Sequence, residues 1–133
     1  MTFDKFTIKA QEVVQEAVNT AQMNGQQTIE PIHVLKGILT KAKDVSTFIF
    51  QKLGVNANQV AMLVDQEIQH LPKVQGGQPY LSNDANSVLT KAMDTAKQMD
   101  DEFVSVEPIL LALLTVNSTA SRILRDAGCN EKD

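Results

Sequence analysis

Two stretches of this sequence carry the same apolar pattern: FTIKAQEVVQEAVNTAQMNGQQTIEPIHVLKGIL at residues 6–39 and LSNDANSVLTKAMDTAKQMDDEFVSVEPILLALL at residues 81–114. A constant shift of 75 positions superimposes them without a gap. The identical pairs include Ala10 with Ala85, Val13 with Val88, Ala17 with Ala92, Thr20 with Thr95, Ala21 with Ala96, and Leu35 with Leu110. Self-similarity at a fixed spacing is the signature of a duplicated unit. The sequence therefore predicts two copies of one helical unit.

Each copy begins with a pair of predicted helices. Apolar residues recur at the spacing i, i+3, i+4 and i+7, which lines one face of a helix. Thr7 and Ser82 stand where the first helices need an N-cap, and Gly25 is expected to end the first of them. The second helices are expected to begin at Pro31 and just after Ser105.

The third helices are predicted at about residues 45–53 and 119–127, each followed by a glycine. A further helix in the first copy carries an apolar stripe of Val60, Leu63, Val64 and Ile68. Two prolines and two glycines then break any helix. We therefore expect an all-α fold in which residues 1–133 form one globular domain of two pseudo-symmetric repeats. Repeat 1 is expected at about 6–70, a hinge at 71–80 and repeat 2 at about 81–130.

The composition is that of an ordinary globular domain. A chain of 133 residues with 43% hydrophobic and 21% charged residues suits one core and favours neither disorder nor a membrane protein. The net charge of -4, with both signs interspersed, provides no basic surface for nucleic acid. The polar amino terminus, the lack of a long apolar stretch and the single cysteine predict a cytoplasmic protein without a membrane partner.

Residues able to support catalysis or metal binding do not gather in this sequence. His33 and His70 have no partner at the spacing of a zinc site, and His33 is interpreted as structural. No glycine-rich phosphate loop is present. The acidic residues 100–102 lack the alternating ligands of a calcium loop, and Cys129 is interpreted as a buried thiol. We therefore expect no catalytic residue, no metal site and no cofactor in this domain.

Binding is the remaining class of function. Methionines such as Met23, Met93 and Met99 can mark adaptable binding surfaces, although they more often fill a core. Two tandem units packed face to face are expected to leave a groove between them, and grooves between helices commonly take peptides. The sequence therefore favours a binding module over an enzyme.

Four motifs carry a resemblance to a known family. They are FDKFT at residues 3–7, IEPIHVL at 29–35, LPKVQG at 71–76 and DEFVSVE at 101–107. Together they make the whole chain resemble the amino-terminal domain of ClpB-type protein disaggregases, a double Clp repeat that precedes two ATPase modules.

The resemblance implies an accessory domain that captures unfolded or aggregated polypeptide and passes it to the ATP-driven pore of a hexamer. ATP and magnesium would then bind in modules outside this chain. Adaptor or co-chaperone proteins are further partners that the resemblance allows. It implies a monomer for the isolated domain and a hexamer for the full-length protein.

The resemblance also implies which residues contact a client. A polar set matching Thr7, Asp101 and Glu107 is tied to chaperone work in this family. Leu89 and Met93 are our candidates for an apolar groove beside that set. Thr7 and Glu107 have a second interpretation, as a helix cap and a first-turn carboxylate.

The alternative is an adaptor-docking domain of a Clp protease unfoldase of the ClpA or ClpC type, which would bind one folded partner tightly. ClpC domains usually carry a Gly-Thr-Glu-His-Ile-Leu-Leu type of second helix in both repeats. Here the matching places read IEPIH at residues 29–33 and VSVEP at residues 104–108. This difference favours ClpB and argues against carrying over the phosphoarginine recognition of ClpC.

Overall fold

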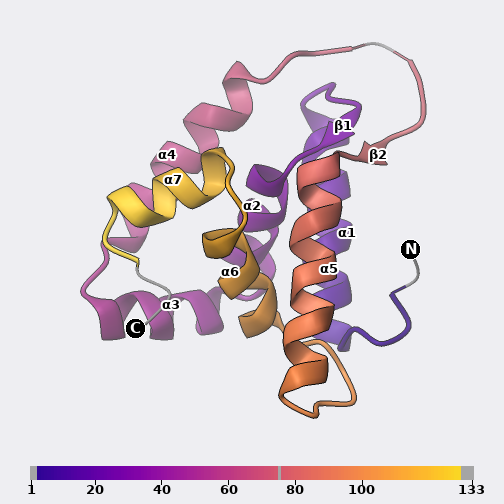
Figure 1. The fold of residues 1–133 in the computed structure, drawn as a ribbon. Helices are drawn as coiled ribbons and strands as arrows, with labels where there is room; N and C mark the ends of the chain where they lie inside the picture. Colours follow the sequence, from indigo (N-terminus) through magenta and orange to yellow (C-terminus); the bar gives the residue numbers. More distant parts are fainter. Residues whose placement is uncertain (1–2, 75, 130–133) are drawn as a thin grey trace.

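The computed structural model describes residues 3–74 and 76–129, and the fold is all-α, as predicted (Figure 1). The predicted end of repeat 2 at residue 130 lies outside the described residues. The helices are α1 (Ile8–Met23), α2 (Pro31–Lys41), α3 (Lys43–Leu53), α4 (Ala57–His70), α5 (Asn83–Gln98), α6 (Val106–Thr115) and α7 (Thr119–Asp126), and the strands are β1 (Thr28–Ile29) and β2 (Tyr80–Leu81).

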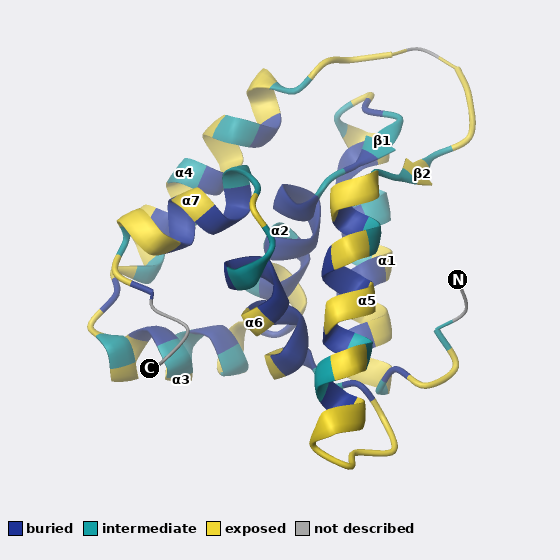
Figure 2. Cartoon of the chain, in the orientation of Figure 1, coloured by how far each residue is buried: buried dark blue, intermediate teal, exposed yellow. Residues whose placement is uncertain are grey.

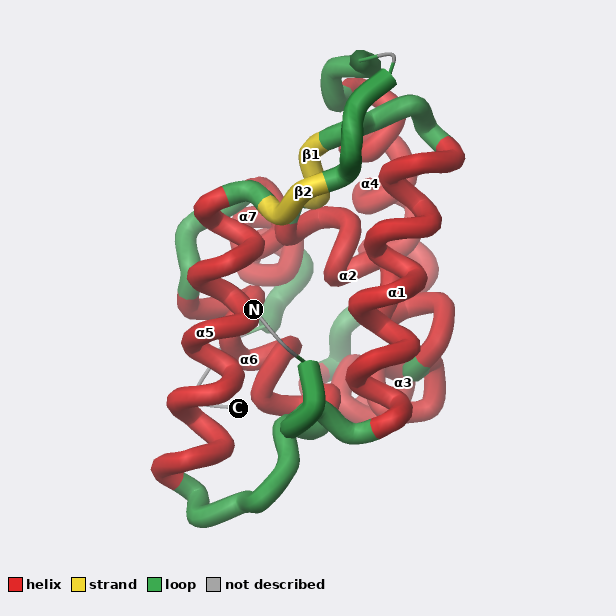
Figure 3. Tube along the Cα trace, turned by 90° about the vertical axis from the view of Figure 1, so that its right-hand side faces the viewer, coloured by secondary structure: helices red, strands yellow, loops and turns green. Residues whose placement is uncertain are grey.

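The helices α2 and α6 lie in the middle of the molecule. Helices α1 and α5 lie on one side of them, and α3, α4 and α7 lie on the other (Figures 1 and 3). Helix α1 packs chiefly against α2, and α5 chiefly against α6. The dark interior of Figure 2 follows these contacts, since the buried faces of α1, α2, α5 and α6 turn inward.

The caps predicted for the first helix of each repeat are present, whereas Ser105, at the start of α6, makes no side-chain cap bond. Thr7 Oγ1 accepts a hydrogen bond from the Ala10 amide at 3.1 Å, and Ser82 Oγ accepts one from the Ala85 amide at 3.0 Å. Each bond satisfies one of the amide groups that a helix leaves free in its first turn. Helices α1 and α5 therefore begin in the same way in both repeats.

The start of each first helix is paired with the start of the second helix of the other repeat. Strands β1 and β2 are parallel and align Ile29 with Leu81. An isolated parallel bridge aligns Phe6 with Val104, which are the same two positions after the shift of 75. The sequence analysis did not predict either pairing, because two-residue strands have no periodicity to detect.

Candidate binding site

The Phe6–Val104 bridge brings two of the predicted site residues to one end of the molecule. The Thr7 amide donates to the Val104 carbonyl at 2.9 Å, and the Val104 amide donates to the Lys5 carbonyl at 2.7 Å. The beginning of α1 therefore lies beside the beginning of α6, where Glu107 occupies the exposed side of the first turn. Thr7 and Glu107 belong to one end of the fold.

Asp101 belongs to the loop that leads to this end. Its amide donates to the Ala96 carbonyl at 2.9 Å, which closes the carboxyl end of α5. The side chains of Asp100, Asp101 and Glu102 are all exposed, in line with the prediction of a solvated loop. In residues 3–74 and 76–129, no group of three or more His, Cys, Asp or Glu side chains is placed to hold a metal ion.

The prediction that Leu89 lines an open groove is wrong for this structure. Leu89 has 0% of its surface exposed and belongs to the core. Ala85 and Ala92, which lie one turn before and after it on α5, are also buried. Leu89 therefore sits in the centre of the buried face, whereas Met93 lies at its edge, half-buried against the core. Of the two candidates, Met93 alone retains surface that a partner could contact.

Exposed apolar side chains at the same end were missed by the sequence analysis. Ile8, the first residue of α1, is 77% exposed, and Phe103, just before Val104, is 46% exposed. Phe103 precedes the buried Val104 in the extended segment of the parallel bridge, and successive residues of such a segment point to opposite sides, so its side chain faces outward. Ile8 follows the cap directly and precedes the apolar stripe of its helix.

His33 has the structural role that was predicted. It is fully buried, its Nδ1 accepts from the Glu30 amide at 2.8 Å, and its Nε2 lies 2.7 Å from Gln26 Oε1. Gln26 Nε2 donates in turn to the Ile68 carbonyl at 2.6 Å. Because Nδ1 is an acceptor here, Nε2 must carry the proton of the neutral ring. Burial lowers the pKa of His33 from 6.5 to about 4, so the ring remains neutral at pH 7.

Cys129 is buried, as predicted, and burial raises the pKa of its thiol. A protonated thiol is a poor nucleophile. The cysteine therefore belongs to the packing of the domain.

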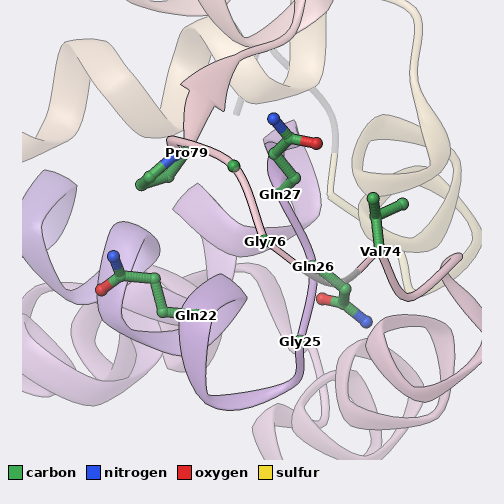
Figure 4. A pocket seen from close by; sticks show the side chains of 8 residues that line it. Gln22, Gly25, Gln26, Gln27, Val74, Gly76 and Pro79 are labelled. Carbon is green, nitrogen blue, oxygen red and sulfur yellow. The ribbon is translucent and has the colours of Figure 1, made fainter.

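A pocket of about 500 Å³ lies at the opposite end, where the connector between the repeats crosses the loop after α1 (Figure 4). It is lined by Gln22, Gly25, Gln26, Gln27, Val74, Gly76, Gly77 and Pro79. None of the five predicted site residues lines it. A Cβ on Gly77 would lie 2.5 Å from Nε2 of the flexible Gln27 side chain, which would have to move, and the φ angle of 117° itself favours glycine.

The comparison with protein families decides the classification. The family model described as the Clp repeat (R) N-terminal domain matches residues 5–127. The chain belongs to this family. The predicted resemblance is therefore confirmed, and residues 5–127 have the all-helical fold expected of a Clp repeat domain.

Curated relatives resemble this Clp repeat domain over its full length. The chaperone protein ClpB of Bacteroides thetaiotaomicron is 60% identical over 133 residues, which is 100% of this chain and 15% of that protein. The chaperone protein ClpB of Porphyromonas gingivalis is 45% identical over 132 residues, or 99% of this chain and 15% of that protein. The chain thus spans about one-seventh of the length of these relatives.

Solved structures share the fold at low identity. The Hsp104 N-terminal domain from Candida albicans has a TM-score of 0.83 and 22% identity, covering 97% of this chain and 85% of that one. The N-terminal domain of ClpD from Arabidopsis thaliana has a TM-score of 0.75 and 21% identity, with coverage of 99% and 90%. The relatives at 60% and 45% identity are ClpB proteins, which favours the ClpB type over the ClpA or ClpC alternative.

Proposed function

We propose that this Clp repeat domain binds apolar segments of non-native polypeptides on behalf of a ClpB-type chaperone. The observation that supports this proposal is the set of exposed apolar side chains at the end where α1 and α6 begin, beside Thr7, Asp101 and Glu107. Its relatives at 60% and 45% identity are named as chaperones. The domain would act without catalysis of its own, in the cytoplasm, and ATP-driven work would belong to other parts of the longer protein.

The physical basis for binding is burial of exposed apolar side chains such as Ile8 and Phe103. Covering apolar surface gains about 25 cal/mol per Å² and does not require a particular client sequence. Ordering an unfolded client costs conformational entropy, which removes much of that gain. We therefore expect dissociation constants of about micromolar or weaker.

The polar residues around this patch would orient the client. Glu107 and Asp101 are exposed carboxylates that can accept hydrogen bonds from backbone amides or pair with basic side chains of a client. Thr7 differs from them, because its hydroxyl already accepts the Ala10 amide. Thr7 would contribute to client binding by its position beside the segment of residues 103–107.

The test is an amide NMR titration with a permanently unfolded polypeptide, repeated with the same protein in its folded form. We expect shifts near Ile8, Met93, Phe103 and Glu107 with the unfolded form only. The variant Phe103→Ser should weaken binding by about tenfold, since it removes one half-exposed aromatic side chain. Phe48→Ser, which removes a 68% exposed phenylalanine from α3, is the matched control and should leave the affinity unchanged.

A second pair of variants separates the cap from a binding role at Thr7. Thr7→Ala and Ser82→Ala each remove one N-cap bond and should each cost about 1 kcal/mol of unfolding free energy. Only Thr7 lies beside α6, so only Thr7→Ala should also weaken client binding. Equal client binding by both variants would mean that Thr7 acts only as a helix cap. In the titration itself, tight binding of one folded protein would favour adaptor docking over client capture.

A further inference from the structure

The end of α1 carries the pair Asn24–Gly25, which is the only Asn-Gly pair in the sequence. Asparagine is one of the chemically labile residues of proteins. Its side chain reacts most readily when glycine follows, because the nitrogen of a glycine is not shielded by a Cβ. The matching positions of the second repeat hold Met99 and Asp100, so the pair belongs to the first repeat. Asn24 is half-buried and Gly25 is exposed, so solvent has access to this pair.

The folded structure holds Asn24 in an arrangement that blocks the reaction, which requires the Gly25 nitrogen to approach Asn24 Cγ. The ψ angle of Asn24 is 9°, so the main-chain nitrogens of Asn24 and Gly25 are nearly eclipsed. The Gly25 nitrogen therefore points away from the Asn24 side chain, and its proton is donated to the Gln22 carbonyl at 3.1 Å. The side-chain amide of Asn24 donates to the Thr20 carbonyl at 2.8 Å. These contacts must break before the nitrogen can reach the carbon.

Exposed hydrogen bonds join Asn24 to the segment that leaves α4. Gln69 Nε2 donates to Asn24 Oδ1 at 2.9 Å, and Lys73 Nζ donates to the Asn24 carbonyl at 3.3 Å. The Val74 amide donates to the Gly25 carbonyl at 2.9 Å, which fastens the connector between the repeats to the same turn. Exposed bonds of this kind open at a lower free energy than the core does. Local opening at this turn can therefore free Asn24 while the rest of the domain stays folded.

We propose that Asn24 is a site of spontaneous deamidation and that opening of these hydrogen bonds sets its rate. Hydroxide takes the proton of the Gly25 amide, and the Gly25 nitrogen forms a bond to Asn24 Cγ. The side-chain nitrogen takes up a proton from water and leaves as ammonia, which gives a five-membered imide. Water then adds to either carbonyl of the imide and opens the ring, leaving aspartate or isoaspartate at position 24. Water and hydroxide are the only other reactants.

Both products change the contacts at the end of α1. A carboxylate still accepts from Gln69, but it cannot donate to the Thr20 carbonyl, and it places a negative charge beside Lys73. Isoaspartate also lengthens the main chain by a CH₂ group, which displaces Gly25 from the Val74 amide. We therefore expect the isoaspartate form to loosen the connector and the aspartate form to retain it.

The test incubates the chain at mildly alkaline pH, folded and in urea, and follows aspartate and isoaspartate at position 24 by peptide mapping with mass spectrometry. We expect conversion to be at least about tenfold faster in urea, because unfolding frees both the side chain and the Gly25 amide. Gln69→Ala should speed conversion in the folded chain by about threefold, since it removes one exposed hydrogen bond. Gln66→Ala, at an exposed site one turn earlier on α4, is the matched control and should leave the rate unchanged.

Asn117, which precedes Ser118, is a reference site in the same chain, and Gln69→Ala should leave its rate unchanged. Equal conversion of Asn24 in the folded and the urea-unfolded chain would overturn control by the fold. Equal rates in Gln69→Ala and Gln66→Ala would overturn the role of the hydrogen bonds, and no conversion in urea would overturn the site itself. Asn24 and Ile8 lie at opposite ends of α1, so client binding is scored separately and either proposal can fail without the other.

Discussion

The two repeats use the same pair of crossing helices but close the loop between them in different ways. In the first, Gln26 is buried and joins His33 to the Ile68 carbonyl, so the loop is tied to the end of α4. In the second, the matching positions hold Asp101, which is exposed, and Pro108, whose side chain has no group that can form a hydrogen bond. One loop is fastened by buried hydrogen bonds, and the other presents Phe103 to solvent.

The difference between the two loops shows that one repeat can keep a stabilising hydrogen-bond network while the equivalent loop of the other repeat exposes side chains that a partner could contact. Buried hydrogen bonds such as those of Gln26 and His33 fix one arrangement, because breaking them leaves polar groups unpaired. Among the described residues, the second loop is held at Val104 by backbone hydrogen bonds and by no buried side-chain bond of this kind, and it carries polar and apolar side chains facing water. A surface for partners can therefore change in the second repeat without disturbing the network of the first.

The largest expected effect is the loss of the His33 network in acid. The folded state keeps His33 neutral, with a pKa of about 4 against 6.5 for the free side chain. The unfolded chain therefore binds more protons between these values. The contribution of His33 to the unfolding free energy is fully present above pH 6.5 and is lost as the pH falls from 6.5 to about 4. This pKa difference corresponds to about 3 kcal/mol. Urea unfolding at pH 7 and pH 4.5 measures the loss.

The control for this prediction is His33→Gln, which cannot titrate. The variant should be less stable than the parent at pH 7, because glutamine does not reproduce both bonds of the ring. It should lose less additional stability than the parent between pH 7 and pH 4.5. If the two chains lose the same amount, carboxylates and not His33 govern the acid response.

The next effect in size concerns the crossing of the paired helices. Gly37 lies where α2 crosses α1, and a Cβ there would lie 2.4 Å from the Val13 carbonyl oxygen. The matching residue of the second repeat is Ala112, which is buried, so α5 and α6 leave room for a methyl group. We expect Gly37→Ala to cost about 2 kcal/mol, since overpacking outweighs the gain in helix propensity.

Urea unfolding of Gly37→Ala beside Ala112→Gly tests whether the two crossings differ. Ala112→Gly should cost about 1 kcal/mol, from helix propensity and a small lost contact. A Gly37→Ala chain as stable as the parent would mean that α1 and α2 can separate freely, and the two crossings would then be equivalent.

The helices could be predicted from the sequence because their signals are local. Apolar spacing, the caps at Thr7 and Ser82 and the glycines at positions 54 and 128 act within a few residues of each helix end. The predicted start of α3 was two residues late, since its N-cap is Ala42, which makes no side-chain cap bond. Boundaries without a cap residue leave no trace in the sequence.

The candidate site was harder to predict because exposure depends on tertiary packing. Leu89 and Met93 lie on neighbouring turns of α5, and the packing of this helix, chiefly against α6, leaves one buried and the other at the edge. The bridge between Phe6 and Val104 joins residues far apart in sequence, so the shared location of Thr7 and Glu107 came from the family resemblance and not from periodicity. Contact of these residues with a client stays a prediction.

The smallest expected effect is a gain in stability at the end of α5. The helices α1 and α5 end alike: the amides of Gln26 and Asp101 donate to the carbonyls of Ala21 and Ala96 at 2.8 and 2.9 Å. The residue before each of these has a positive φ, 68° at Gly25 and 62° at Asp100. A left-handed conformation costs a residue with a Cβ free energy that glycine avoids, although glycine adds entropy to the unfolded chain.

Asp100→Gly should therefore raise the unfolding free energy by about 0.5 kcal/mol, and Gly25→Asp should lower it by about 1 kcal/mol. Space does not limit the second change, because the nearest atom to a Cβ at Gly25 is Lys73 Cβ at 3.9 Å. Thermal or urea unfolding of both variants measures the pair. If Asp100→Gly were destabilising, the Asp100 carboxylate itself would stabilise the turn. The aspartate of the second repeat would then do more than tolerate the positive φ angle that glycine adopts in the first.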